Sequence, residues 1–329
     1  TSDHLDNSET VIFNPDHRAT SLYSAFVQDE IALVPDRLRL TLGSKVEHND
    51  YTGWEIQPSG RLSLSITPKQ TVWFAASRAV STPSRAENDI RINQVIPGAG
   101  PIPNTLVSSF GSTEMESKEL IGFELGYRIQ PHDRITFDLA TFYNLYDKQR
   151  SIEPSGAPQV LPPGYVMVPV TIDNMIDGET YGFELASTWQ ATDWWRLKLN
   201  YTFWRLSLHR EQGSGDTSLE FAERDSPRHQ VGIRSLMDLT HSIEFDTGIR
   251  YVDALPTRMR FANGSVTDGV PSYIVGDARI GWRPNKNWEV SLVGQNISDA
   301  SHQEFAPSYI QTQVTQVETS VFAKITFRY

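Results

Sequence analysis

The chain has 329 residues, of which 39% are hydrophobic and 11% aromatic, and its formal net charge is −11. The acidic excess argues against a nucleic-acid partner, because phosphate recognition needs a basic face. The absence of cysteine excludes disulfides, thiolate metal sites and cysteine nucleophiles. The mean hydropathy of −0.38 is typical of a soluble protein, but strands that are apolar at every second position escape such averages.

The amino-terminal segment, residues 1–18, is polar and carries no clear period. We interpret it as a loop or a strand remnant, with residues 10–13 as a candidate strand. Residues 1–10 do not resemble a signal peptide. We therefore expect a processed chain or a fragment of a longer one.

From residue 19 onward, apolar and polar residues alternate in runs of roughly 10 to 15 residues, the length that crosses a bilayer at a tilt. In the run 121–129, Ile, Phe, Leu, Tyr and Ile fall on one side, opposite Gly, Glu, Gly and Arg. A period of two predicts a β-strand with one apolar face. Strands of a soluble sandwich are usually shorter, about 5 to 6 residues.

This pattern predicts thirteen strands and two kinds of connection. The strands are expected at 19–34, 38–48, 56–66, 71–80, 117–129, 134–147, 176–189, 194–208, 228–238, 242–253, 272–283, 287–297 and 316–329. Short polar turns are expected near 34–37, 67–70, 130–133, 190–193, 238–241 and 283–286. They alternate with long connections near 47–58, 81–115, 147–172, 209–226, 255–271 and 300–315.

The alternation of tight turns with long loops indicates the fold class. Outer-membrane barrels have short periplasmic turns and long extracellular loops. We therefore expect an all-β, antiparallel transmembrane β-barrel built as an up-and-down meander. With thirteen strands, the first and the last strand would be parallel, whereas bacterial single-chain barrels have even numbers of strands. We therefore expect either a further strand near residues 10–13 or the absence of an amino-terminal part of the barrel. An open sheet edge in lipid leaves backbone groups unsatisfied.

Seven segments, in order along residues 19–329, resemble the carboxy-terminal half of TonB-dependent outer-membrane receptors. They are the hairpin 58–65 and 73–78 with Thr-Pro-Ser at 82–84, the Glu-x-Gly strand at 119–127, Ala-Thr-Phe-Tyr-Asn-Leu-Tyr at 140–146, Tyr-Gly-Phe-Glu within 179–185, Ser-Pro-Arg-His-Gln at 226–230, Gly-Gln-Asn-Ile-Ser-Asp at 294–299 and Phe-Arg-Tyr at 327–329. The resemblance implies a 22-stranded barrel with an amino-terminal plug that recruits TonB. Residues 1–329 would then be a single, partial barrel region of about 13 strands without the plug, with residues 19–329 as barrel strands and loops.

No sequence pattern indicates catalysis. The eight histidines show no metal-ligand spacing, and no P-loop, zinc-protease motif or nucleophile elbow is present. We expect neither an enzyme, a metal site nor a cofactor. At the long-loop end, arginine and aromatic residues would suit an anionic, aromatic ligand through charge pairing and stacking. The candidate contacts are Arg78, Arg85, Tyr146, Arg150, Trp204, Arg258 and Tyr309. The alternative for each is a place in the outer aromatic girdle or against lipopolysaccharide phosphate.

The resemblance implies a receptor in the outer membrane of a Gram-negative bacterium that binds a scarce nutrient, foremost a ferric siderophore, and admits it with energy from TonB. Expected partners are the bilayer and lipopolysaccharide, TonB and the plug in the intact protein, and the barrel-insertion machinery. The last strand would address that machinery through Phe327 and Tyr329. Open alternatives are a plug-less passive channel of about 14 strands, a soluble β-rich binding protein and, more distantly, a barrel enzyme.

Overall fold

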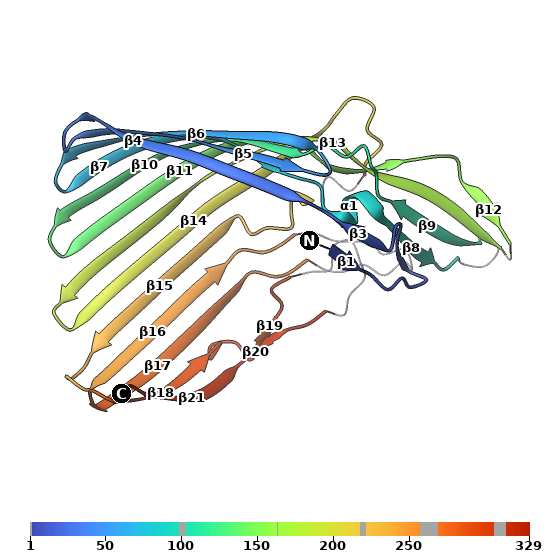
Figure 1. Cartoon of the computed structure of the whole chain (residues 1–329). Helices are drawn as coiled ribbons and strands as arrows, with labels where there is room; N and C mark the ends of the chain where they lie inside the picture. Colours follow the sequence, from blue (N-terminus) through green and yellow to red (C-terminus); the bar gives the residue numbers. More distant parts are fainter. Residues whose placement is uncertain (1, 99–102, 163, 218–221, 257–268, 306–313) are drawn as a thin grey trace.

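The computed structural model describes residues 2–98, 103–162, 164–217, 222–256, 269–305 and 314–329. Thirteen long strands form one antiparallel meander in which each strand pairs with the next (Figure 1). They are β4 (Leu22–Val34), β5 (Leu38–Asn49), β6 (Gly53–Thr67), β7 (Gln70–Ser81), β10 (Lys118–His132), β11 (Ile135–Pro154), β13 (Tyr165–Thr192), β14 (Trp195–Arg210), β15 (His229–Asp238), β16 (Ile243–Val252), β17 (Tyr273–Asn285), β18 (Trp288–Gln295) and β21 (Ser320–Phe327).

The thirteen strands expected from the sequence are confirmed, and all six short turns lie at one end of the sheet (Figure 1). Asp36 shows why such turns close locally. It adopts a positive φ of 59° between β4 and β5, a conformation that Asp tolerates better than most residues. The amide of Arg37 then donates to the carbonyl of Val34 at 3.1 Å.

One expected long connection is wrong. Residues 47–58 were expected to be a loop, but β5 and β6 are joined by residues 50–52 alone. The side-chain oxygen of Asn49 accepts from the amides of Tyr51 and Thr52, each at 2.9 Å. Gly53 follows with a φ of +75°, which a residue without a Cβ adopts at little cost. Local Asn and Gly chemistry thus closes a tight hairpin at the long-loop end.

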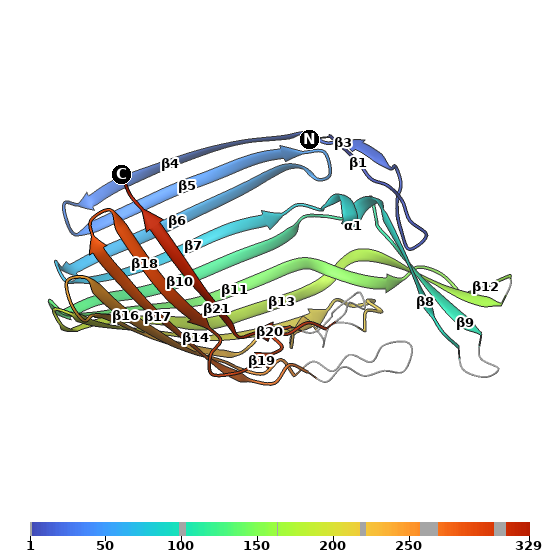
Figure 2. The ribbon, with the colours of Figure 1, turned by 90° about the horizontal axis from the view of Figure 1, so that it is seen from below.

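The two faces of the sheet differ in polarity, as the period of two predicts. On β10, the outward row includes Ile121, Phe123 and Leu125, which are 43%, 37% and 52% exposed. Among the described residues, no second sheet or helix layer covers this row (Figure 2). Within the described ranges, few apolar side chains are buried, and they are Met115, Ile176, Val252, Leu255, Val270 and Val275. The outward row is therefore an apolar surface that no other element of the described structure covers.

The sheet has two edges among the described residues. β4 pairs only with β5 and β21 only with β18, and the two edge strands both run toward the turn end. Every residue of β4 is exposed. The candidate strand at residues 10–13 does form, as β2 (Val11–Phe13). It pairs with β8, however, and so adds no strand to the meander of thirteen long strands, which we call the wall.

The long-loop end carries structure that the alternation did not predict. The expected loops 81–115 and 147–172 contain α1 (Arg85–Asp89), β8 (Ile90–Ile96), β9 (Asn104–Phe110) and β12 (Gln159–Leu161). β9 pairs in parallel with the first part of β13 and antiparallel with β8, and β12 pairs with β13. These short strands therefore extend the same sheet beyond the long strands (Figure 2). Two small pairs, β1 (Ser2–His4) with β3 (His17–Ala19) and β19 (Ser301–His302) with β20 (Val317–Glu318), complete this end. No helix among the described residues has the length and apolarity needed to cross a bilayer.

Candidate ligand-binding site

A cavity of about 440 Å³ opens on the inward face of the wall, at the long-loop end. β11, β13 and β14 supply most of it, and α1 and β10 close one side. Its lining residues are Glu87, Lys118, Tyr146, Gln149, Arg150, Ile176, Thr180, Trp204, Leu206, Leu208 and Ala222. Three of the candidates from the sequence, Tyr146, Arg150 and Trp204, therefore meet in one cavity although they come from two strands.

The strand register puts the aromatic residues on the inward face. Tyr146 lies opposite Leu120, one step from the outward pair of Ile121 and Leu145. Thr180 is 2% exposed and receives a hydrogen bond from the Asn144 amide at 3.0 Å. Its hydroxyl lies 3.4 Å from the Tyr146 hydroxyl, to which it donates. This chain of polar contacts holds the tyrosine hydroxyl in the lining of the cavity.

Cations outnumber carboxylates around the cavity. Lys118 and Arg150 contribute two positive charges against the single carboxylate of Glu87. Lys118 Nζ donates to Glu87 Oε1 at 2.8 Å. Burial alone would raise the pKa of Glu87, but the Lys118 ammonium and the amide and hydroxyl of Ser84 outweigh it and lower that pKa. Net positive charge beside Tyr146 and Trp204 suits an anionic ligand with aromatic groups.

Helix α1 holds Glu87 in this position. Ser84 caps the helix, and its hydroxyl accepts from the Glu87 amide at 3.2 Å while the Ser84 amide donates to Glu87 Oε2 at 2.9 Å. This reciprocal capping box satisfies two otherwise unpaired donors. The chain after β9 packs closely on the helix, because a Cβ added at Gly111 would lie 2.7 Å from the carbonyl carbon of Asn88.

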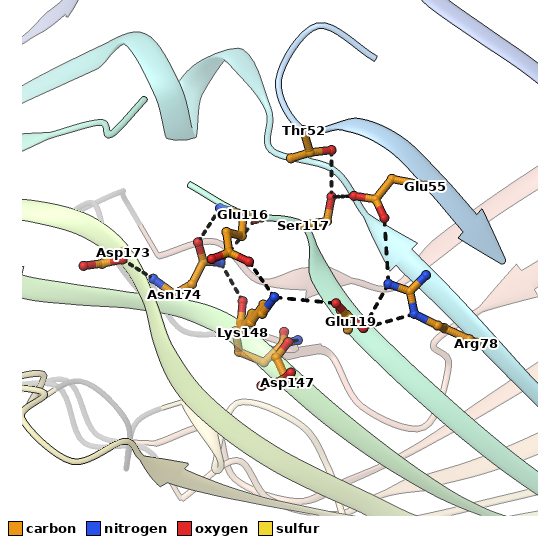
Figure 3. Close-up of polar contacts among 11 residues, drawn as sticks. Thr52, Glu55, Arg78, Glu116, Ser117, Glu119, Asp147, Lys148, Asp173 and Asn174 are labelled. Carbon is orange, nitrogen blue, oxygen red and sulfur yellow. Dashed lines mark hydrogen bonds and ion pairs between the residues drawn. The ribbon is translucent and has the colours of Figure 1, made fainter. Parts of the chain in front are cut away.

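Arg78, another candidate contact, lies outside the cavity in a network of ion pairs at the rim (Figure 3). Its Nε donates to Glu119 Oε2 at 3.0 Å, and its Nη2 is 3.8 Å from Glu55. Ser117 donates to Glu55 Oε1 at 2.5 Å. The Arg78 guanidinium therefore joins β6, β7 and β10.

A second part of the rim network joins β11, β13 and the segment that precedes β10 (Figure 3). Lys148 contacts Glu116 at 2.5 Å and Glu119 at 3.7 Å, and its bond to Glu116 raises the pKa of Lys148. Asn174 accepts from the Glu116 amide at 2.7 Å and donates to the Lys148 carbonyl at 2.6 Å. These contacts hold the loop ends of β10, β11 and β13 in register next to the cavity.

Arg85 lies on α1 and holds the amino-terminal segment. Its guanidinium bonds to Asp3 at 2.5 Å, lies 3.5 Å from Asp89 and stands over the Phe13 ring at 5.3 Å. The bond from Arg85 lowers the pKa of Asp3. Only 11% of the Arg85 side chain is exposed, so its contacts are with the chain itself.

The remaining predicted residues lie elsewhere. Arg258 and Tyr309 fall outside the described residues. Phe327 ends β21 with its ring 4.8 Å from that of Trp288, and Tyr329 is fully exposed at the terminus. Two further residues of the cavity, Lys118 and Thr180, were not among the predicted contacts. Lys118 continues the inward row of β10, and this position could have been predicted from the alternation. The contacts of Thr180 depend on its neighbours across the sheet, which the sequence does not give.

Three carboxylates meet on the outer rim. Oxygens of Asp147, Asp177 and Glu211 all lie within 4.8 Å of one another. Burial and the Asp177 carboxylate raise the pKa of Asp147. Asp147 lies two residues beyond the outward Leu145, toward the loop end of β11. Exposed acidic groups commonly cluster without an ion, so this group alone is no argument for a metal site. Sequence spacing did not reveal it, because its members come from three segments.

Comparisons with known proteins agree with this architecture. A family model described as "TonB dependent receptor-like, beta-barrel" matches residues 2–297. A probable TonB-dependent siderophore receptor, PiuA of Acinetobacter baumannii, is 23% identical over 211 residues, which are 61% of this chain and 28% of that protein.

Solved structures are similar in fold at low sequence identity. A variant of the ferric enterobactin receptor PfeA of Pseudomonas aeruginosa, in complex with enterobactin, has a TM-score of 0.71 and 19% identity, covering 94% of this chain and 45% of that one. The siderophore receptor PirA of Acinetobacter baumannii has a TM-score of 0.72 and 15% identity, covering 94% and 46%. The chain thus spans about half the length of these structures.

Proposed function

The chain belongs to the TonB-dependent receptor family, matched over residues 2–297, and from this premise we propose that it forms a ligand-binding wall of a receptor for ferric siderophores. Barrels of this family lie in the outer membrane, and the family is one of receptors and transporters rather than enzymes. In the proposed arrangement the short turns face the periplasm and the long loops face outward. The outward apolar row contacts lipid.

The observation that carries the proposal is the cavity at the long-loop end. It combines the cations Lys118 and Arg150 with the rings of Tyr146 and Trp204. Ferric siderophores are often anionic and aromatic, and they would gain charge pairing and stacking there. A ferric enterobactin receptor and a siderophore receptor share the fold. Binding and gated passage make and break no covalent bond.

The proposal extends to the partners of the intact receptor. A plug domain would face the inward polar wall, and TonB would act on that plug. Residues 19–329 would contribute strands and loops to one barrel, completed at the free edges of β4 and β21 by strands from elsewhere, because open edges in lipid are prohibitive. Lipopolysaccharide would surround the outer rim. Phe327 and Tyr329 would serve as the insertion signal.

Arg78 and Arg85 take a supporting part in this proposal. Arg78 is held by Glu119 and Glu55, and Arg85 by Asp3 and Asp89. Paired guanidinium groups of this kind fix the loops around the cavity. Direct contact of either residue with the siderophore would require it to exchange one of these partners.

The test uses the intact receptor, purified in detergent, and ferric enterobactin as the probe. Substituting Arg150→Ala and Trp204→Ala should each weaken binding by about tenfold or more, the usual effect of removing a desolvated charge or a stacked ring. Arg134→Ala, a turn-end change in an ion pair with Asp193 at 2.6 Å, is the matched control and should leave the affinity unchanged. Wild-type affinity in both cavity variants would contradict the proposal.

A further inference from the structure

A second, more apolar groove lies at the opposite end of the wall. It has a volume of about 490 Å³ and lies between the turn that joins β13 to β14 and the turn that joins β15 to β16. Its lining residues are Asp193, Trp194, Asp238, Leu239, Thr240 and His241. Trp194 and Leu239 are 48% and 50% exposed. Two large apolar side chains at the tips of short turns are unexpected if these turns meet only water.

The groove is continuous with the outward apolar face. The Trp194 ring stacks on that of Trp195, with centroids 6.2 Å apart and planes at 22°. Trp195 in turn lies 6.5 Å from Trp189. Trp195 and Trp189 belong to the outward rows of β14 and β13, and Trp195 Nε1 donates to Ser235 at 2.9 Å. A ladder of three indoles therefore leads from the lipid-facing wall into the groove.

The walls of the groove are held by hydrogen bonds. The amide of Asp238 donates to the carbonyl of Trp194 at 2.7 Å, which ties the two turns together. Thr240 closes its own turn, because its amide donates to the Ile243 carbonyl at 3.2 Å and its hydroxyl accepts from the Ile243 amide at 3.0 Å. The groove is thus a preformed feature of the turn end.

The charge around the groove is negative. The Asp193 carboxylate is paired with Arg134 at 2.6 Å. The Asp238 carboxylate has no ion-pair partner in the part of the chain that the structure describes. An indole face next to an unpaired carboxylate is the combination that binds an ammonium group. An anionic headgroup would be repelled at the same place.

We propose that this groove binds a phospholipid with an ammonium headgroup, of the phosphatidylethanolamine class, from the periplasmic leaflet. Its ammonium meets Asp238 and the Trp194 face, and its acyl chains continue along Leu239 and the indole ladder. This inference rests on the membrane placement in the proposed function but not on the siderophore site. It assigns to the turn end a lipid preference beyond general hydrophobic anchoring.

The test is native mass spectrometry of the intact receptor in detergent, titrated with equimolar phosphatidylethanolamine and phosphatidylglycerol. The wild type should retain phosphatidylethanolamine preferentially. Asp238→Asn should reduce that preference about fivefold, the scale of one ammonium contact, and Trp194→Ala should reduce retention of this lipid. Asp133→Asn is the matched control, because Asp133 is a turn-end carboxylate outside the groove, paired with Lys69, and it should change nothing. Equal retention of both lipids by the wild type, or a wild-type preference in Asp238→Asn, would overturn the inference.

A second measurement distinguishes failure of the proposed lipid site from failure of the membrane placement. Receptor reconstituted in vesicles with acyl-brominated lipids should lose tryptophan fluorescence, because Trp189 and Trp195 face lipid. Quenching without a headgroup preference overturns the lipid site alone. The absence of quenching overturns the membrane placement, and the lipid site with it.

Discussion

The two ends of the sheet are built by different means. At the turn end, a few residues close each connection through their own backbone and side chains, as at Asp36 and Arg37. At the loop end, only the β5–β6 hairpin closes in this local way among the connections described above. The connections 81–115 and 147–172 carry α1, β8, β9 and β12, and contacts between distant segments hold this end, such as Lys118 with Glu87 and Asn174 with Glu116. The same thirteen long strands connect the two ends. Local chemistry therefore specifies the scaffold, whereas the residues of the candidate site come from segments far apart in sequence.

The largest expected effect concerns the wall itself. Leu199→Arg places a charge on the outward face of β14, where Leu199 is 36% exposed, and should destabilise the inserted state by about 2–4 kcal/mol if the site lies at the bilayer midplane. Asn200→Arg, on the inward face, should cost much less. Reversible refolding from denaturant into vesicles measures both. Equal costs would refute the assignment of the outward and inward faces of β14.

A change at the loop end should disturb that end alone. A Cβ at Gly111 would press on the backbone of Asn88, so Gly111→Ala should destabilise α1 and its contacts locally by about 1–3 kcal/mol, the usual cost of overpacking. Hydrogen exchange should speed up in 85–96 and remain slow in β10 and β14. Gly156→Ala, whose Cβ would meet Pro169 at an ordinary 3.4 Å, is the control. Faster exchange throughout the wall would show that the two ends are not independent.

The ion pair of Glu87 should make the loop end sensitive to acid. Because the folded state lowers the pKa of Glu87, its stabilising contribution is present above pH 4.5, its ordinary value, and is lost as the pH falls through the lowered pKa. We expect a local loss of about 1 kcal/mol. Protease cleavage within 82–117 should accelerate at low pH in the wild type. In the Glu87→Gln variant, cleavage should be faster than in the wild type at neutral pH and nearly independent of pH. If cleavage of this variant still accelerated at low pH as in the wild type, Glu87 would not be the source of the acid sensitivity.

The smallest effect is expected at the outer rim. The folded state raises the pKa of Asp147, so the stability contribution of its protonated form is present below pH 3.8, its ordinary value, and is lost as the pH rises through the raised pKa. Asp147→Asn should therefore stabilise the protein slightly at neutral pH, within about 0.5 kcal/mol for an exposed site. The gain should vanish near pH 3. A gain that persists in acid would point to another cause.

The scaffold followed from the sequence because its signals are local. Alternation places each outward residue, and Pro, Asp and Asn mark the turns, so strands such as β10 and β14 were located within a few residues. The prediction of a long loop at 47–58 was wrong because alternation weakens around Asn49 and Gly53. The turn-forming chemistry of these two residues is nevertheless local and could have indicated a hairpin.

The candidate site was only partly accessible from the sequence. Tyr146, Arg150 and Trp204, which line one cavity, were predicted as contacts because their residue types suit an anionic, aromatic ligand and their positions suit the loop end. The position of Glu87 depends on a five-residue helix that a capping box fixes. Alternation of apolar and polar residues does not indicate such a helix. The ion pairs of Arg78 and Arg85 join residues 41 and 82 positions apart, and no pattern along the chain records such distances.

The central claim is that lipid contacts every second residue of the wall. Spin labels placed singly at residues 197–202 of β14, in the intact receptor reconstituted in vesicles, test it through their accessibility to oxygen and to a water-soluble nickel complex. We predict a period of two, with oxygen favoured at 197, 199 and 201 and nickel favoured at 198, 200 and 202. Uniform accessibility along the strand, or protection of positions 197, 199 and 201 from both reagents, would contradict the account.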